Sequence, residues 1–154
     1  MSLEMIIDRT MSDVNNAKLL RLKIQSGQSL TESEQSAFER GACTITMLNR
    51  IENAQKTLAE LLNKYAYRVS VSTKTDWGYS DIFDNANYNR ILNNLNVLKS
   101  AYYTYSSTPD TPGYIFGYEE ANDIEKILSD IDGMITSMKN NFRECGTFNC
   151  GKDE

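Results

Sequence analysis

The sequence predicts a mainly α protein, a bundle of about four helices. Three stretches place apolar side chains at alternating steps of three and four residues, which is the heptad spacing of helices that pack against one another. Capping-box patterns mark the starts of two helices. The length of 154 residues matches one domain. We therefore expect a single helical domain over residues 1–154, with residues 1–9 as an N-terminal extension and residues 145–154 as a C-terminal tail.

We expect the first helix over residues 10–26. Thr10 is followed by Asp13 in a capping-box pattern, and Gly27 stands where a glycine commonly ends a helix. The apolar residues fall on two sides, with Val14, Ala17, Leu20 and Ile24 on one and Leu19 and Leu22 on the other. This pattern predicts that both sides of the helix are covered. One explanation is that the second side contacts a partner.

The second helix opens with the capping box of Thr31 and Glu34 and can run as far as Tyr65. Gly41 lies inside this stretch and marks a kink or a break. The apolar seam predicted along the stretch comprises Thr44, Met47, Ile51, Ala54, Leu58, Leu61 and Tyr65.

The third helix follows Asp84 as its N-cap, and the polar residues and prolines of 106–112 end it. The fourth begins after Gly117, with Glu119 and Glu120 in its first turn, where acidic groups suit the helix dipole. The third seam comprises Tyr88, Ile91, Leu95, Leu98, Tyr102 and Tyr105. The fourth comprises Ala121, Ile124, Leu128, Ile131, Ile135, Met138 and Phe142. Long helices with matching seams predict a bundle.

Two connections between these helices differ from simple turns. Residues 68–75 alternate Val69 and Val71 with polar neighbours, a pattern that favours a short strand. Residues 114–116 form a second apolar stretch between glycines. The two stretches are long enough to pair as a short two-stranded β-ribbon beside the bundle.

A weak internal echo links two of the predicted helices. Asn49-Arg50-Ile51 and Asn89-Arg90-Ile91 lie 40 residues apart, and Leu58 and Leu98 keep the same register. A helical duplication produces such an echo. Chance recurrence in an asparagine-rich chain with heptads produces it as well, and both explanations stay open.

The residue types that are absent or rare exclude several kinds of chemistry. The chain has no histidine, which excludes histidine-dependent triads and the commonest general base. Three cysteines without histidine do not favour a zinc site. Cys145 and Cys150 can close a small loop in an oxidising compartment, but residues 1–8 lack the features of a secretory signal, so we expect free thiols. We assign no catalytic, cofactor-binding or metal-binding residue.

Charge and hydropathy narrow the classes of partner. The net charge of -5 and the pI near 4.8 argue against nucleic acid, because binding phosphates requires a clustered basic surface. The apolar runs are a few residues long, too short for a membrane span. We expect partners that are proteins or neutral ligands.

The aromatic residues gather in one part of the chain. Twelve of the fifteen lie between Tyr65 and Tyr118, and several of these fall on the two long connections rather than on a seam. Tyrosine and tryptophan offer rigid contact area with a polar group, which suits protein interfaces and the stacking of sugars. The candidate interaction residues are Tyr67, Trp77, Tyr79, Phe83, Tyr114 and Phe116. The alternative is that they cover the end of the bundle.

Short phrases along the chain carry a family resemblance. They are Ile7-Asp8-Arg9-Thr10, Leu48-Asn49-Arg50-Ile51-Glu52, Lys74-Thr75-Asp76-Trp77, Asn93-Asn94-Leu95 and Tyr118-Glu119-Glu120-Ala121-Asn122. Together they resemble small virion-associated proteins, of the tail or baseplate type, from phages and prophages of Gram-positive bacteria. The resemblance implies a non-enzymatic structural role in the virion after synthesis in the bacterial cytoplasm, with other virion proteins or further copies as partners. The alternative is a receptor-binding module that holds host cell-wall carbohydrate on its aromatic loops.

Overall fold

The computed structural model describes residues 3–145 and is mainly helical, as the sequence predicts. None of its helices is both long enough and apolar enough to cross a lipid bilayer, within the residues described. The possible pair of Cys145 and Cys150 is not described, because Cys150 lies outside this range. The five helices are α1 (Met11–Gln25), α2 (Glu32–Gly41), α3 (Ile45–Lys64), α4 (Asn85–Ala101) and α5 (Tyr118–Cys145).

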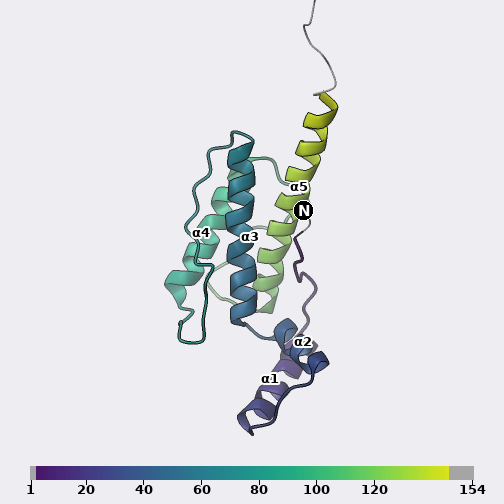
Figure 1. Cartoon of the computed structure of the whole chain (residues 1–154), viewed down its shortest axis with the longest axis vertical. Coiled ribbons are helices and arrows are strands. Elements are labelled where there is room, and N and C mark those ends of the chain that lie inside the picture. The colour runs from purple at the N-terminus through teal and green to yellow at the C-terminus, as the bar shows by residue number, and fades with distance from the viewer. Residues whose placement is uncertain (1–2, 146–154) are drawn as a thin grey trace, which may run out of the picture.

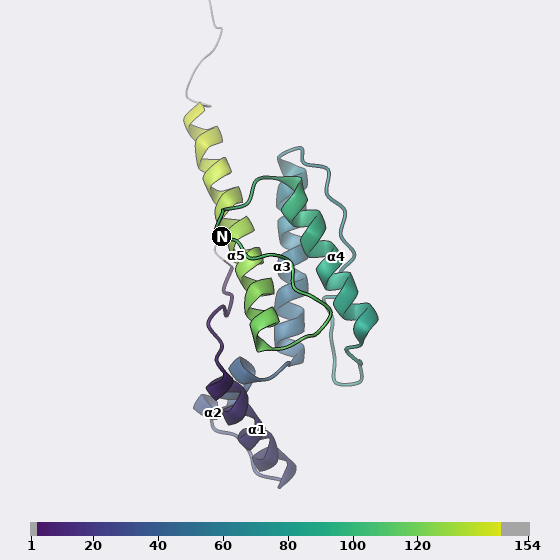
Figure 2. The same ribbon diagram turned by 180° about the vertical axis from the view of Figure 1, so that it is seen from behind.

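Helices α3, α4 and α5 form a three-helix bundle whose members all run in the same direction (Figure 1). A parallel arrangement requires long connections that return along the bundle, and residues 65–84 and 102–117 provide them (Figure 2). Most residues of the predicted seams meet in one buried cluster, which includes Ile51, Leu58, Leu95, Leu98, Ile124, Leu128, Ile131 and Ile135. The third seam is shorter than predicted, because α4 ends at Ala101 and both Tyr102 and Tyr105 are exposed. Ile51, Ile91 and Ile124, one from each helix, are all almost completely buried.

Helices α1 and α2 pack against each other as a hairpin that lies beyond the N-terminal ends of the bundle helices (Figure 1). The stretch predicted as one long helix is therefore two helices, with the break that Gly41 marks in the sequence. A Cβ at Gly41 would stand 2.0 Å from the backbone oxygen of Asp13, so α1 and α2 approach too closely for a side chain. Ala42 is extended, and Thr44 caps α3. The expected bundle of about four helices is a bundle of three with a hairpin.

The predicted capping boxes are present at the starts of both hairpin helices. Thr10 and Asp13 cap α1, and Thr31 and Glu34 cap α2, each with both reciprocal hydrogen bonds. The two apolar sides predicted for the first helix differ in their surroundings. On the first side Ala17 and Leu20 are buried, but Ile24 is exposed. Leu19 and Leu22 are both exposed, so the second side lacks a cover within the described chain.

The predicted β-ribbon is not observed, because no strand occurs among residues 3–145. Residues 68–75 are extended as the alternation of Val69 and Val71 indicates, but they do not pair with residues 114–116. Their backbone groups instead bond to side chains of the helices. Val69, for example, donates its N–H to Asn63 Oδ1 at 3.0 Å and accepts at its oxygen from Asn63 Nδ2 at 2.7 Å.

Candidate interaction surface

Residues 68–77, here called the strap, lie along α3 and α4 (Figures 1 and 2). Ser72 bonds to Asn94 of α4 as Val69 bonds to Asn63: its N–H donates to Asn94 Oδ1 at 3.2 Å, and its oxygen accepts from Asn94 Nδ2 at 2.7 Å. An extended segment beside a helix has no neighbouring strand to satisfy its backbone, and asparagine side chains offer a donor and an acceptor in its place. The helices therefore recognise the backbone of the strap.

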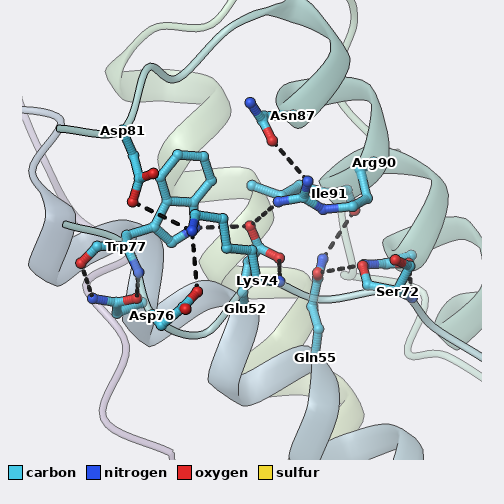
Figure 3. Close-up of polar contacts among 12 residues, drawn as sticks. Glu52, Gln55, Ser72, Lys74, Asp76, Trp77, Asp81, Asn87, Arg90 and Ile91 are labelled. Carbon is cyan, nitrogen blue, oxygen red and sulfur yellow. Dashed lines mark hydrogen bonds and ion pairs between the residues drawn. The ribbon is translucent and has the colours of Figure 1, made fainter.

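The end of the strap is held by three side chains, here called the α3 cradle: Asn49 and Glu52 of α3 with Arg90 of α4. Trp77 N–H donates to Asn49 Oδ1 at 2.8 Å, and the Trp77 oxygen accepts from Asn49 Nδ2 at 3.2 Å. Lys74 N–H donates to Glu52 Oε2 at 2.5 Å, and Trp77 Nε1 donates to Glu52 Oε1 at 2.9 Å. Figure 3 shows Trp77 and Arg90 converging on Glu52.

Glu52 is completely buried, and its charge is balanced by Arg90, whose Nη2 lies 2.5 Å from Glu52 Oε1. The Trp77 ring is also flanked by cations, with Lys74 Nζ 5.4 Å and Arg90 Cζ 5.9 Å from its centroid, within reach of a cation–π attraction. A buried carboxylate is tolerated where a cation and hydrogen-bond donors surround it. The α3 cradle thus fixes both the backbone and the ring of Trp77.

A second cradle holds the N-terminal segment, residues 3–9, against α5. This α5 cradle consists of Asn122 and Glu125 of α5 with Arg50 of α3. Arg9 N–H donates to Asn122 Oδ1 at 3.0 Å, and the Arg9 oxygen accepts from Asn122 Nδ2 at 3.0 Å. Ile6 N–H donates to Glu125 Oε2 at 2.6 Å, and Arg9 Nη2 donates to Glu125 Oε1 at 2.5 Å. Glu125 is also completely buried.

The two cradles repeat one arrangement. In each, an asparagine binds both backbone groups of one residue, and a glutamate one helical turn further on binds the backbone N–H three residues earlier. The glutamate also accepts from the side chain of the first residue and from an arginine of another helix. That arginine is Arg90 on Glu52 and Arg50 on Glu125. The two arginines of the sequence echo therefore occupy equivalent places in the fold.

Sequence reasoning missed the third member of this pattern. Asn122-Asp123-Ile124-Glu125 carries the asparagine, isoleucine and glutamate of Asn49-Arg50-Ile51-Glu52, with aspartate in place of arginine. The counterpart in α4 ends in Leu92 instead of glutamate, so no single phrase is complete in all three helices. The signal shared by the two cradles is an asparagine followed three residues later by a glutamate, with a buried isoleucine between them.

An aromatic cluster ties the two long connections together. Phe83 lies edge-on to Trp77 and to Phe116, with ring centroids 5.9 and 5.4 Å apart, and Tyr88 lies 5.1 Å from Phe116. Tyr88 also donates its hydroxyl to the Gly113 oxygen at 2.9 Å. Burial of the hydroxyl raises the pKa of Tyr88 to about 12. Edge-on aromatic contacts of this kind fix the rings relative to one another.

Four large side chains on the same two connections point away from the protein. We call Tyr79, Ile82, Tyr114 and Ile115 the loop surface. They are 97%, 80%, 85% and 82% exposed, respectively, and each is within two residues of a member of the aromatic cluster. Large side chains exposed on loops that are held in place are typical of contact surfaces. The aromatic cluster gives these loops a fixed base.

The structure places the six predicted interaction residues in four different surroundings. Tyr79 and Tyr114 are exposed on the loop surface, and Phe83 and Phe116 are half-buried in the cluster beneath it. Trp77 is 5% exposed and belongs to the core, because Glu52 provides a buried partner for its Nε1. The remaining residue lies apart from these: the ring of Tyr67 packs edge-on against Tyr102, with centroids 5.2 Å apart.

Ile82 and Ile115 were missed because the sequence search for a contact surface considered aromatic residues. Each stands beside an aromatic residue on a connection, where no period separates a core residue from an exposed one. No group of three or more histidine, cysteine, aspartate or glutamate side chains among the described residues is placed to hold a metal ion. Comparisons of the chain with protein-family models, with curated proteins and with solved structures found no significant match.

Proposed function

We propose that this chain is a non-enzymatic structural protein of a phage or prophage virion, associated with the tail or baseplate, and that it works by protein–protein contact. The observation that supports this proposal is the loop surface. Tyr79, Ile82, Tyr114 and Ile115 are almost fully exposed, yet they stand on loops that the aromatic cluster and the α3 cradle hold in place. A contact surface on ordered loops loses little conformational entropy when it binds.

The partners proposed are other virion proteins or further copies of this chain. The loop surface offers two tyrosines, which are enriched among the residues that carry the binding energy of protein interfaces. The exposed side of α1, with Leu19 and Leu22, offers a second contact of the same kind. A protein with two separate contact surfaces can link neighbours in an assembly.

The proposal is tested by replacing Tyr79 and Ile115 together, Tyr79→Ala with Ile115→Ser. Because both side chains are exposed, we expect the melting temperature to stay within about 2 °C of the wild type. The measured quantity is the number of copies per purified particle, by quantitative mass spectrometry, in a producing strain that carries the variant. Incorporation should fall at least tenfold, which corresponds to a loss of about 1.4 kcal/mol of binding free energy.

Tyr103→Ala is the matched control, because Tyr103 is an exposed tyrosine on one of the same two connections but is not part of the loop surface. Its incorporation should equal that of the wild type. Equal incorporation of all variants would exclude the loop surface as the contact. Absence of the wild-type chain from purified particles would exclude the virion role altogether.

The second candidate is a receptor-binding module that holds host cell-wall carbohydrate. The observation that favours it is that one connection carries both the exposed Tyr79 ring and the Asp76 carboxylate, whose side chain is 85% exposed, since aromatic faces stack on sugars and carboxylates accept from their hydroxyls. Sedimentation with purified cell walls distinguishes the two functions. If the chain binds carbohydrate, the wild type sediments with the cell walls and Tyr79→Ala does not. A wild-type chain that stays in solution would exclude this function.

A further inference from the structure

The N-terminal segment and the hairpin form one structural unit, residues 3–41, here called the N-terminal unit. Arg40 of α2 joins its parts: Nη2 lies 2.9 Å from Asp8 Oδ1 in the N-terminal segment, and Nε lies 3.2 Å from Asp13 Oδ1 in α1. Within the described chain this unit is linked to the bundle through residues 42–44. The segment, the hairpin and the link are therefore placed to move together.

The joint between the N-terminal unit and the bundle is incompletely packed. A cavity of about 260 Å³ lies there, lined by Arg9, Val14 and Arg40 on one side and by Met47, Phe116 and Ala121 on the other. Helix α2 contributes no buried residue, and α1 contributes two. The polar contacts at the α5 cradle, with the half-buried Leu3 and Met5, thus provide most of the attachment.

The charges of the α5 cradle permit the segment to leave. Glu125 is bound by two arginines, Arg9 of the segment and Arg50 of α3. When Arg9 departs, Glu125 keeps both of its bonds to Arg50, at 2.7 and 3.2 Å. Glu52 has a single arginine as its charge partner, together with hydrogen bonds from Lys74 N–H and Trp77 Nε1. An empty α5 cradle therefore does not leave a buried charge without a partner, which is the costly case.

A second conformation of the link would join the two helices. The sequence allows one helix over residues 31–65 with a kink or a break at Gly41, and the structure breaks it with the extended Ala42 and a new N-cap at Thr44. If residues 42–44 become helical, α2 and α3 form one continuous helix. The N-terminal unit would then project away from its own bundle and be available to another.

We propose that the N-terminal unit exchanges between two copies of this chain, so that residues 3–9 of each copy dock in the α5 cradle of the other. The docked contacts are the same in the closed monomer and in the exchanged dimer, which makes exchange a low-cost route to association. The α5 cradle identifies the partner as a second copy, because the segment that it binds is a segment of this chain.

The biological role of the exchange rests on the proposed assembly function. The exchange itself uses the α5 cradle and not the loop surface. Its test uses the purified full-length chain alone. Exchange can therefore fail while the loop surface proves to be the contact in particles, and the reverse is equally measurable.

The test changes the balance between the two conformations of the link with Thr44→Ala. The Thr44 hydroxyl accepts from Met47 N–H at 3.2 Å and donates to Glu39 Oε2 at 2.5 Å, and both bonds belong to the closed form. Loss of an N-cap shifts such an equilibrium about fivefold, so the two links of a reciprocal dimer should raise its association constant about 25-fold. Light scattering after size-exclusion chromatography measures this constant.

Two further variants serve as controls. Thr31→Ala removes the equivalent cap from α2, outside the link, and should leave the association constant within about twofold of the wild type. Cys43→Pro should block association even when combined with Thr44→Ala, because proline cannot continue a helix. The closed form accepts this proline, since Ala42, with φ of -116° and ψ of 152°, already has the conformation that precedes one.

Cross-linking of a mixture of ¹⁴N- and ¹⁵N-labelled chains identifies the dimer. Exchange predicts that links between the N-terminal unit and the bundle join a light chain to a heavy chain. Links confined to one chain, a Thr44→Ala variant no more associated than Thr31→Ala, or a dimer that survives Cys43→Pro would each overturn the proposal. Should Thr44→Ala fail to fold by circular dichroism, the wild-type chain and Cys43→Pro are compared at high concentration, and equal association would again overturn it.

Discussion

At the scale of single residues, Glu52 and Glu125 are the most constrained side chains of the described structure. Each is buried, and each accepts hydrogen bonds from a backbone N–H, from a side chain of the segment that it holds and from an arginine of another helix. Hydrogen bonds to charged groups contribute more than those between neutral groups, and losing one partner of a buried set leaves the others unsatisfied. These two residues should therefore dominate the stability of the contacts around them.

We expect Glu52→Gln to lower the free energy of unfolding by about 3–5 kcal/mol, the range for breaking a buried ion pair. Glutamine keeps the shape of glutamate, but it removes the charge that balances Arg90 and replaces one acceptor oxygen with an NH₂ group facing donors. Urea unfolding followed by circular dichroism measures the change. Glu60→Gln is the matched control on an exposed part of the same helix and should change stability by less than about 0.5 kcal/mol. Equal stability of the two variants would show that the cradle contributes no net stability.

At the scale of elements, the composition of helix α4 contains a sign of its function that the sequence analysis did not use. Six of its 17 residues are asparagine, a weak helix former that competes with the backbone for hydrogen bonds. Such a composition indicates that the helix has a task besides packing. Asn94 illustrates the task, because its side chain binds both the N–H and the carbonyl oxygen of Ser72. A concentration of asparagine on a helix was thus the available sign of a docked extended segment.

Local signals predicted the helix starts and the buried seams well. Capping boxes and heptads depend on residues a few positions apart, so the sequence displays them directly. The sequence left open whether Gly41 kinks or breaks the helix, because the close approach of Asp13 decides this. The predicted β-ribbon was wrong for the described residues. Alternating valines predict an extended backbone, but they do not show whether a strand or a row of asparagine side chains binds it. The burial of Trp77 depended in the same way on a distant residue, Glu52.

The two capping boxes make the hairpin sensitive to acid. Hydrogen bonds from the Thr10 backbone hold the pKa of Asp13 below its ordinary 3.8, and Lys23, followed by the Thr31 backbone, holds the pKa of Glu34 below its ordinary 4.5. A carboxylate whose pKa is lower in the folded state stabilises the fold above its unfolded pKa, and this contribution is lost as pH falls through the folded value. The hairpin should therefore weaken as the pH falls below about 4.

This pH dependence is measured by the protection of α1 and α2 amides against hydrogen exchange between pH 6 and pH 3, corrected for intrinsic exchange. Asp13→Asn serves as the control, because asparagine does not titrate and still accepts a hydrogen bond from Thr10. Protection of α1 in this variant should vary less with pH than in the wild type. The same slope in both chains would show that Asp13 does not cause the effect.

At the scale of the whole molecule, extended segments and helices alternate. The N-terminal segment, the strap and the connection of residues 102–117 each return along the bundle, and each is followed along the chain by a bundle helix, the first after the hairpin (Figures 1 and 2). The N-terminal segment docks on α5, so Leu3 N–H reaches Asp132 Oδ2 across most of the chain. Contacts between such distant residues form late and slowly in folding. The strap, in contrast, docks on α3 and α4, the helices that precede and follow it in the sequence.

This difference predicts that the two cradles, although alike in their bonds, protect their segments unequally. Lys74 and Trp77 amides are held within the bundle, and we expect them to exchange hydrogen as slowly as the core of α3, through global unfolding. Ile6 and Arg9 amides belong to a unit with few buried residues, and we expect them to exchange together with the hairpin at a lower opening free energy. Residue-resolved hydrogen exchange by NMR measures both sets in one sample. If Ile6 and Arg9 were as protected as Lys74 and Trp77, the N-terminal segment would be part of the bundle, and the hairpin would open without it.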